Sequence, residues 1–536
     1  MSIYKVAKKE TGEACIFVTI QNLKNHAVDS SISAPKWMYS IHFVCIGIVR
    51  CHVTVKVLNS YVFSSIWIAY GINRKDLVMI DKEYNYLEGK KVAFLTLGCK
   101  VNSYETEAME EMFEQAKAFI VSFNEIADIY VVNTCTVTNI ADRKSRQMLH
   151  KAKKKNNEAI VIAVGCYVQA AKETLLEDDA IDLVIGNNRK KDIISIVNRY
   201  YTDKDAYDIL DIAKDDFYEE LSIQSVKEKT RAYIKIQDGC NQYCSYCIIP
   251  YTRGRIRSRK EEDILEEVKR LIENGYQEVV LTGIHISSYG LDTKTVTEQA
   301  SLRTDDGSMP LLSVLQKLND LSGLKRIRLG SLEPRIITEN FVKTLVSLEK
   351  VCPHFHLSLQ SGCDATLKRM NRKYTSEEYY QRTMLLSKYY KNPAITTDVI
   401  VGFPQETEEE FEMTKKFLEK VGFAQMHIFQ YSKRKGTKAE IMTGQVAEDI
   451  KRKRSEILVE LERKMRRNYL NQFLDKEEEI LTEEEIKLEG VSYMVGHNQR
   501  YVRIAFLANK VCSNELVRVK NVGFLTDDIL MSEIID

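Results

Sequence analysis

Short apolar runs alternate with amphipathic helical patterns from residue 90 onward, and this alternation predicts an α/β fold. In the first part of the chain the apolar runs lie at 92–97, 129–132, 160–164 and 181–185. Helical patterns follow the first two runs, at 105–118 and 143–155. Strands separated by helices pair in parallel, and functional groups collect at the carboxyl ends of parallel strands. Three of these runs end at a cysteine, which favours a site at that edge of the sheet.

The rest of the chain predicts two further folding units. Strand and helix patterns alternate again from 232 to 431, as in a complete or partial (β/α) barrel. A long charged helix follows, and then short alternating strands typical of a small β-barrel. We expect an N-terminal extension (1–88), an α/β domain (89–200), a linker (201–229), a partial barrel (230–445), a linking helix (446–470) and a small β-barrel (471–536).

Composition excludes several classes of protein. The 536 residues are 44% hydrophobic and 29% charged, which is the mix of a globular protein rather than of a disordered one. With 77 Lys and Arg against 76 Asp and Glu, the chain is not a wholly basic nucleic-acid binder, although local basic patches remain compatible with this balance. Twelve cysteines are too few for a disulfide framework, so their spacing carries the information.

Residues 1–88 have no clear periodicity. Their most apolar runs, 38–49 and 57–72, are shorter than the roughly 20 residues that a membrane-spanning helix needs. The stretch also lacks the pattern of a signal peptide. Two interpretations stand: an additional extension, or translated upstream sequence from a misassigned start, in which case Met79 is the natural start.

Cys240, Cys244 and Cys247 form a CxxxCxxC loop at the end of a predicted strand. Three thiolates on one loop suit three irons of a 4Fe–4S cluster and leave the fourth iron for a small molecule. The alternatives are a zinc site or an inert loop. A structural zinc site takes four ligands, and no histidine lies in or next to this loop.

This loop after a strand that opens a barrel resembles the radical S-adenosylmethionine superfamily. The resemblance implies that S-adenosylmethionine binds the fourth iron and is cleaved to a 5′-deoxyadenosyl radical. Strand ends of the superfamily line the cofactor site, which points to Gly283, Gln360, Asp398 and Gly402 as candidate cofactor-binding residues.

Cys99, Cys135 and Cys166 each follow one of the early strands. Taken singly, a cysteine is more often a small buried apolar residue. Taken together, and with the barrel loop, they resemble the methylthiotransferases, whose second 4Fe–4S cluster carries the sulfur. The stretches GCKVNSYETEAM (98–109) and TCTVTNIADRKSRQ (134–147) are most similar to the branch that acts on N6-threonylcarbamoyladenosine in tRNA. The C-terminal barrel resembles the RNA-binding TRAM domain.

One departure from the family concerns backbone geometry. The family has glycine after Phe-Pro, where this chain has Gln405. If that position needs a positive φ, a glutamine there makes the loop geometry uncertain.

The segment after the cysteine loop is rich in arginine, and it predicts contacts with an RNA backbone through Arg253, Arg255, Arg257 and Arg259. The plain alternative is a solvated helix start neutralised by the acidic residues 261–263. Arginine predominates over lysine here, which favours the RNA interpretation.

The resemblance therefore implies an enzyme of the cytoplasm that converts N6-threonylcarbamoyladenosine next to the tRNA anticodon to its 2-methylthio derivative. It implies two 4Fe–4S clusters, S-adenosylmethionine, the anticodon stem–loop of tRNA and an electron donor such as flavodoxin or ferredoxin, with no membrane association. Two alternatives are the same chemistry on isopentenyladenosine in tRNA or on a ribosomal protein. A third is a non-catalytic RNA-binding protein that contains zinc.

Overall fold

The computed structural model describes residues 85–204, 207–224, 230–292, 302, 309–508 and 513–535, and the backbone of four strands before them. Contacts divide the chain into two compact units, Met1–Asn85 and Tyr86–Asp536. The first unit holds an antiparallel sheet of β1 (Ser2–Ala7), β2 (Cys15–Asn22), β3 (Tyr39–Cys45) and β4 (His52–Val55). Both interpretations of this stretch stay predictions, and Met79 lies outside the described residues.

The second unit begins with a six-stranded parallel sheet in the order β10-β9-β8-β7-β5-β6. Its strands are β5 (Lys91–Thr96), β6 (Phe119–Val121), β7 (Ile129–Thr134), β8 (Ile160–Gly165), β9 (Leu183–Ile185) and β10 (Tyr207–Asp208). Its helices are α2 (Lys100–Gln115), α3 (Asn139–Lys155), α4 (Cys166–Ala170), α5 (Lys172–Leu176), η1 (Lys190–Asp192) and α6 (Ile193–Asp203). The strand β10 lies within the segment expected to be a linker.

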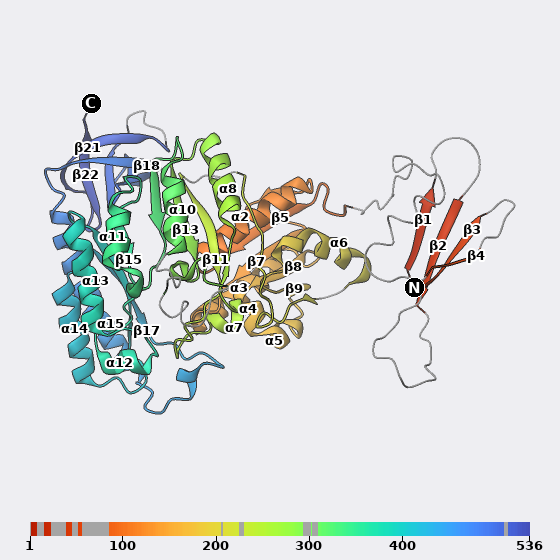
Figure 1. Cartoon of the computed structure of the whole chain (residues 1–536), viewed down its shortest axis with the longest axis horizontal. Coiled ribbons are helices and arrows are strands. Elements are labelled where there is room, and N and C mark those ends of the chain that lie inside the picture. Colours follow the sequence, from red (N-terminus) through yellow and green to blue (C-terminus); the bar gives the residue numbers. More distant parts are fainter. Residues whose placement is uncertain are drawn as a thin grey trace. The chain divides into compact units, whose positions relative to one another are not determined.

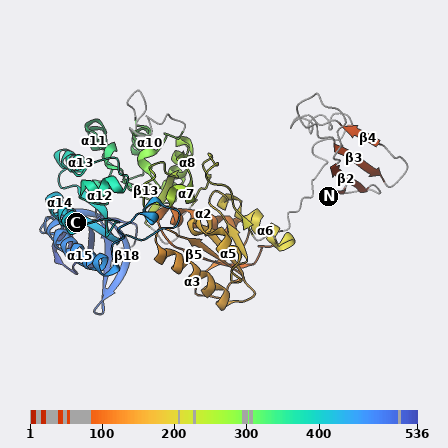
Figure 2. The same cartoon turned by 90° about the horizontal axis from the view of Figure 1, so that it is seen from below.

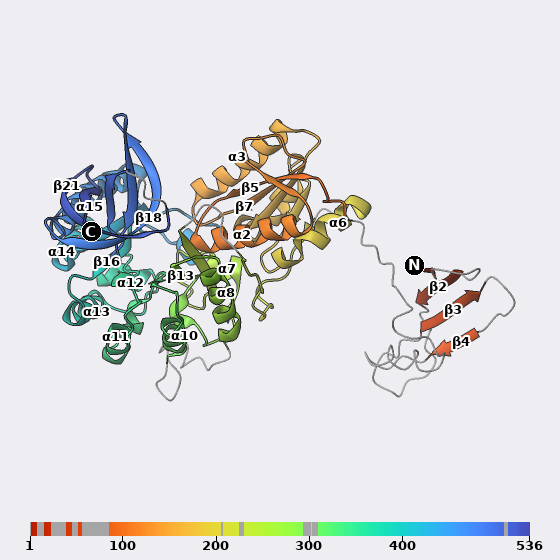
Figure 3. The same cartoon turned by 90° about the horizontal axis from the view of Figure 1, so that it is seen from above.

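Helices α2 and α3 cover opposite faces of this sheet, as Figure 3 shows. Met109 and Phe113 of α2 pack against one face, and Leu149 and Ala152 of α3 pack against the other. Every residue of β7 and β8 is therefore buried, which explains why these strands read as continuous apolar runs. The Thr138 side chain caps α3 by accepting from the Ala141 N–H at 3.1 Å.

The next part of the chain is a partial barrel with helices along its outside, and its strands pair in parallel except β12, which is antiparallel to β11 (Figures 1 and 2). Its strands are β11 (Arg231–Asp238), β12 (Arg257–Ser258), β13 (Glu278–Gly283), β14 (Arg326–Leu329), β15 (His354–His356), β16 (Ala394–Val401) and β17 (Gln425–Gln430). Its helices are α7 (Ile249–Arg253), α8 (Glu261–Glu273), η2 (Ile286–Ser288), α10 (Pro310–Asn319), η3 (Pro334–Ile336), α11 (Glu339–Val346), α12 (Asp364–Arg369), α13 (Ser376–Tyr389), α14 (Glu408–Val421) and η4 (Lys438–Ile441).

The barrel strands run in two sheets, β12-β11-β13-β14 and β15-β16-β17. Parallel bridges from Ile327 to Val351 and from Leu332 to Leu357 join the two sheets at their edges. A single apolar cluster fills the space between these strands and the outer helices. The expected α/β class, with a parallel domain followed by a partial (β/α) barrel, is confirmed.

The C-terminal part begins with α15 (Glu448–Asn471) and ends in a closed barrel. Its strands, in the order β18-β19-β20-β22-β21, are β18 (Glu477–Leu488), β19 (Val491–His497), β20 (Arg503–Leu507), β21 (Leu516–Phe524) and β22 (Ile529–Ile534). The expected small β-barrel is confirmed, and its likeness to the TRAM domain stays a prediction. Among the described helices, none combines the length and apolar character needed to cross a bilayer.

Gln405 adopts the backbone conformation that the sequence left in doubt. Its φ is +67°, in the left-handed region that side chains with a Cβ disfavour. The Gln405 N–H donates to the Gly444 carbonyl at 2.7 Å. This hydrogen bond helps the turn to keep a positive φ despite its conformational free-energy cost.

Replacing Gln405 with Gly should therefore stabilise the fold by about 0.5–1 kcal/mol, because glycine adopts this φ without the Cβ clash. Thermal unfolding of the two proteins should show a small rise in the midpoint. Gln381→Gly, in the regular helix α13, is the matched control and should lower it. A lower midpoint for Gln405→Gly would show that the turn is not strained.

Candidate functional site

Three cysteines lie at the carboxyl edge of the N-terminal sheet. Cys99 follows β5 and precedes α2, Cys135 follows β7, and Cys166 begins α4 directly after β8. Because β5, β7 and β8 are neighbours in the sheet and run in parallel, their carboxyl ends lie side by side. The structure thus brings together the three residues that the sequence placed at separate strand ends.

The backbone around these cysteines is tightly packed. Gly98 has a φ of +105°, and a Cβ at Gly98 would lie 2.9 Å from the Cys135 sulfur. Cys166 accepts from the Arg253 Nε at 3.2 Å and from the Asn187 Nδ2 at 3.8 Å. Burial, with Cys166 and Cys99 close by, raises the pKa of Cys135 to about 11. The three thiols therefore share one small region.

The second set of thiols lies on the loop after β11. Arg372 Nη1 donates to the Cys244 sulfur at 3.3 Å, and the Gln242 N–H approaches the Cys240 sulfur at 3.5 Å. Burial, with Cys244 close by, raises the pKa of Cys240 to about 12. Burial and both neighbouring thiols also raise the pKa of Cys247. Since thiolates are the ligands, cluster assembly must displace these protons.

The distances between the sulfur atoms bear on whether either cysteine trio could bind a single zinc ion. Four thiolates around one zinc lie about 3.8 Å apart, given Zn–S bonds of about 2.3 Å in a tetrahedron. Within the described part of the chain, neither cysteine trio has all its sulfurs within 4.8 Å of one another. A cubane cluster holds its ligands farther apart, because each thiolate binds a different iron. At neither trio does the structure therefore hold the three sulfurs at the separation expected for ligands of a single zinc ion.

A buried charge cluster connects the two cysteine sites. Arg253, at the end of α7, is fully buried. Its Nη1 donates to Glu105 at 2.8 Å and pairs with Asp238 at 3.0 Å, and its Nη2 donates to Asn102 at 2.7 Å. We call this set, together with two buried lysines, the Arg253 node: Asn102, Glu105, Lys190, Lys235, Asp238 and Arg253.

The Arg253 node carries an excess of positive charge. Lys190, Lys235 and Arg253 face the two carboxylates of Glu105 and Asp238, which leaves one positive charge. Burial opposes ionisation of Glu105, yet the three cations hold its pKa well below the usual value. The Arg253 guanidinium of this node donates to the Cys166 sulfur, so the surplus charge lies against one of the three N-terminal thiols.

The structure corrects the prediction that four arginines grip RNA. Arg253, Arg257 and Arg259 are buried: Arg257 donates to the Arg253 carbonyl at 2.6 Å, and Arg259 pairs with Glu267. Only Arg255 of the four is exposed. The local pattern of charges could not reveal this, because the partners of Arg253 in the N-terminal domain are about 150 residues away.

The candidate cofactor-binding residues differ in their position on the strands and in their backbone conformation. Gly283 ends β13, and a Cβ there would lie 2.9 Å from the Gln237 carbonyl. Gln360 has a φ of +74° and pairs with β16. Asp398 was expected at a strand end but lies inside β16.

Gly402 has a clear structural function. Its N–H donates to Glu406 at 2.9 Å, and a Cβ would lie 2.3 Å from the Lys451 side chain. A role for Gly402 and the other three candidates in binding S-adenosylmethionine stays a prediction.

Several polar side chains near the cysteine loop could not be recognised from the sequence. Arg372 contacts Cys244, as described above. Glu333 accepts from Arg335 Nε at 2.7 Å, and Arg335 approaches Gln242 at 3.4 Å. Burial lowers the pKa of His285, which also lies near Glu333, to about 4. No spacing signal marks these residues, since they lie in separate connections between the strands and helices of the barrel.

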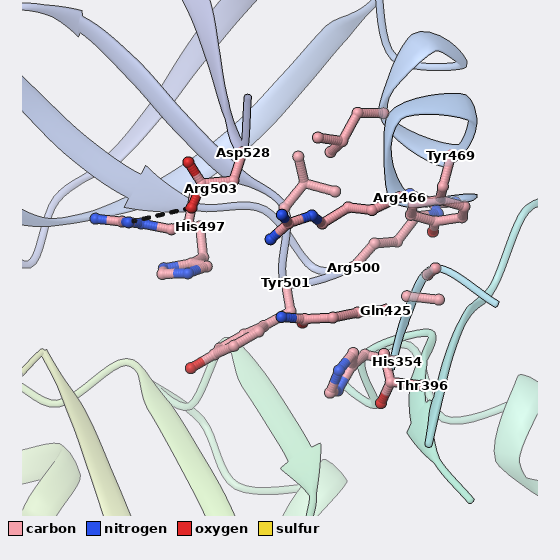
Figure 4. Close-up of a pocket in the computed structure, with 14 residues that line it drawn as sticks. His354, Thr396, Gln425, Arg466, Tyr469, His497, Arg500, Tyr501, Arg503 and Asp528 are labelled. Carbon is pink, nitrogen blue, oxygen red and sulfur yellow. Dashed lines mark ion pairs between the residues drawn. The ribbon is translucent and has the colours of Figure 1, made fainter. Parts of the chain in front are cut away.

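A small cavity lies at the opposite, amino-terminal ends of β15, β16 and β17, where α15 and the C-terminal barrel meet them (Figure 4). It encloses about 130 Å³. The Tyr501 ring stacks on His497 with centroids 4.3 Å apart and lies 5.2 Å from His354. Arg503 pairs with Asp528 across 4.0 Å. The contact of Tyr501 with His354 of β15 joins the C-terminal barrel to the barrel strands, away from both cysteine sites.

Two family matches cover the cysteine-bearing domains. Residues 234–418 match the Radical SAM superfamily, and residues 91–186 match a family described as Uncharacterized protein family UPF0004. The first range contains the loop Cys240–Cys247, and the second contains Cys99, Cys135 and Cys166.

Curated relatives extend the similarity over most of the chain. The Threonylcarbamoyladenosine tRNA methylthiotransferase MtaB of Bacillus subtilis (strain 168) is 39% identical over 80% of this chain and 93% of its own length. The protein of the same name from Aquifex aeolicus (strain VF5) is 38% identical over 78% of this chain and 98% of its own. A tRNA-2-methylthio-N(6)-dimethylallyladenosine synthase of Finegoldia magna (strain ATCC 29328 / DSM 20472 / WAL 2508) is 32% identical over 81% of this chain and 92% of its own length.

The packing of Gly98 against Cys135 yields a selective test of the N-terminal site. In Gly98→Ala, the new methyl group meets the Cys135 side chain at 2.9 Å and the φ of +105° is disfavoured. The reconstituted variant should hold about four irons instead of about eight, because only the N-terminal trio is disturbed.

Gly89→Ala is the matched control. Gly89 also has a positive φ, +79°, but nothing lies within 4 Å of the added methyl group. It should keep the full iron content. An unchanged iron content in Gly98→Ala would contradict the placement of a cluster at this site.

Proposed function

This chain belongs to the methylthiotransferase family of radical S-adenosylmethionine enzymes, and on that premise we propose that it modifies N6-threonylcarbamoyladenosine in tRNA. The chain is a tRNA methylthiotransferase that uses S-adenosylmethionine and two 4Fe–4S clusters. The finer proposal is that it places the methylthio group on carbon 2 of the threonylcarbamoyl-modified adenine next to the anticodon.

The observation that carries the proposal is the pairing of two three-cysteine sites in one unit. We assign Cys240, Cys244 and Cys247 to the radical-generating cluster, and Cys99, Cys135 and Cys166 to the cluster that carries sulfur. The presence of three free thiols at each site supports this assignment, because three thiolates leave one iron of a cubane cluster without a cysteine.

The choice of substrate is supported by similarity. The relatives from Bacillus and Aquifex at 38–39% identity act on threonylcarbamoyladenosine by name, whereas the dimethylallyladenosine synthase of Finegoldia is 32% identical. The residues around Cys99 and Cys135 also resemble the threonylcarbamoyladenosine branch. Dimethylallyladenosine is the alternative substrate.

When bound, the clusters and S-adenosylmethionine supply the radical, the sulfur and the methyl group. The residues of the chain hold these groups and adjust their surroundings. Arg372 donates to Cys244 and Arg253 donates to Cys166, so each site has one ligand sulfur that accepts from a guanidinium. Hydrogen bonds of this kind orient a ligand sulfur in its site.

For RNA binding we propose the exposed cations rather than the buried ones. Arg255 and Lys260 are exposed beside the cysteine loop. On α15, Lys451 and Arg454 are buried, and Arg454 pairs with Glu406 at 2.7 Å. The basic side chains of α15 that stay exposed are Arg452, Lys453, Arg463, Lys464 and Arg467. An electron donor such as flavodoxin or ferredoxin completes the proposed set of partners.

Mass spectrometry of tRNA nucleosides tests the substrate. A strain that lacks the gene should lose 2-methylthio-N6-threonylcarbamoyladenosine and accumulate its unthiolated precursor, and the restored gene should reverse both changes. A gene that carries Cys240→Ala should not restore the product, because a radical-site ligand is missing. Loss of the methylthio derivative of dimethylallyladenosine instead would overturn the proposal.

A further inference from the structure

Three polar side chains from neighbouring strands lie together on the second barrel sheet. They are His356 of β15, Asp398 of β16 and His427 of β17, and their ligand atoms all lie within 4.8 Å of one another. Nowhere else in the described part of the chain do three His, Cys, Asp or Glu side chains each place a ligand atom within that distance. We call these three residues the His–Asp trio.

The strands present the His–Asp trio on the inner face of the sheet. Asp398 is directly opposite His427 in the strand register, and His356 is opposite Thr396, two residues before Asp398. Val399, which follows Asp398, is buried in the apolar cluster with side chains of the outer helix α14. Successive side chains of a strand point to opposite faces, so Asp398 points inward. His427 is exposed and Asp398 is partly exposed, which gives ions in solution access to the trio.

The ring of His356 is oriented with one nitrogen toward Asp398. Its Nδ1 lies 3.0 Å from the Thr396 hydroxyl. Its Nε2 is buried and has no hydrogen-bond partner among the residues that the structure describes, although the Asp398 carboxylate is 3.3 Å away. We therefore place the ring proton on Nδ1, which turns the Nε2 lone pair toward Asp398. A lone pair and a carboxylate repel each other unless a cation lies between them.

The separation of these two atoms is that of neighbouring ligands on one metal ion. In a tetrahedral zinc site, bonds of about 2.0–2.1 Å place adjacent nitrogen and oxygen ligands about 3.3–3.4 Å apart. The His356 Nε2 and the Asp398 oxygen are 3.3 Å apart, and His427 offers a third ligand atom within 4.8 Å of both. Because the His427 ring is exposed, its side chain can rotate toward an ion without disturbing the core.

The ligand set indicates which class of ion fits. Mg²⁺ and Ca²⁺ take oxygen ligands, whereas imidazole nitrogen suits Zn²⁺, Fe²⁺ and other first-row transition ions. Two imidazoles and one carboxylate are therefore suited to a divalent ion of this second class. Three protein ligands also leave a fourth position open, as in zinc sites that bind a water molecule or a substrate.

We propose that the His–Asp trio binds one divalent first-row transition ion, separate from both 4Fe–4S clusters. Its ligands are nitrogen and oxygen, whereas the proposed cluster ligands are sulfur. Thr396 orients His356 from outside the coordination shell, as the hydrogen-bond partners of metal-binding histidines commonly do. The assignment gives Asp398 a role different from its candidate role in binding S-adenosylmethionine.

The test uses the full chain with Zn²⁺ as the probe. The clusters are first reconstituted anaerobically, so that iron already occupies the cysteines. After equilibrium dialysis against chelator-buffered Zn²⁺, metal analysis should give one zinc per chain in addition to the iron. X-ray absorption at the zinc edge should show nitrogen and oxygen neighbours at about 2.0–2.1 Å and no sulfur at about 2.3 Å.

Four variants locate the ion. His427→Ala and Asp398→Asn should each abolish the stoichiometric zinc, because each removes one ligand. Thr396→Val keeps the shape of the side chain and should weaken zinc binding about 10- to 100-fold. His150→Ala is the matched control and should keep the zinc. The Nε2 of His150 also lies beside a carboxylate, 2.8 Å from Asp178, but the pair belongs to no three-ligand set in the described structure.

Three results would overturn the metal site. They are an intact protein with full iron content and no stoichiometric zinc, zinc with sulfur neighbours, and zinc retained in both His427→Ala and Asp398→Asn. Iron content is measured for every variant, and if a ligand variant loses its iron as well, unchanged zinc affinity in Thr396→Val overturns the site. None of these measurements needs RNA or S-adenosylmethionine, so their failure leaves the proposed function intact.

Discussion

The guanidinium group of Arg253 donates to both cysteine-bearing domains at once, and the geometry of the site depends on this one buried cation. Its Nε reaches Cys166, its Nη2 reaches Asn102, and its Nη1 pairs with Asp238 at the end of β11. Arg253 itself follows the cysteine loop by six residues. One side chain therefore contacts an N-terminal cysteine and the end of the strand that leads into the loop with the other three.

A buried charge of this kind is costly unless every donor is satisfied. Glu105 accepts from two nitrogens of Arg253 and also pairs with Lys190 and Lys235. Removing one member of such a network leaves an unpaired charge, which costs about 3–5 kcal/mol. The network also gives Cys166 a positive neighbour, so the same interaction joins the two domains and contacts one of the N-terminal cysteines.

The strand ends could be predicted from the sequence, and the burial of the arginines could not. Alternating apolar runs placed Cys99, Cys135 and Cys166 at the ends of parallel strands, and parallel strands bring their ends together whatever the helices between them. The arginines after the cysteine loop looked like a surface patch, because a local pattern contains no information about acceptors such as Asn102 and Glu105. That His356 and His427 lie beside Asp398 could not be predicted either, since the three residues lie on three strands. The likeness of the C-terminal barrel to the TRAM domain remains a prediction.

Iron content and S-adenosylmethionine cleavage of two triple variants test most directly that the chain holds two separate clusters. After anaerobic reconstitution, the intact protein should bind about eight irons, and each triple variant about four. Changing Cys240, Cys244 and Cys247 to Ala should abolish reductive cleavage. Changing Cys99, Cys135 and Cys166 to Ala should preserve cleavage but prevent methylthiolation. An intact protein that binds only four irons, or zinc in their place, would contradict the two-cluster account.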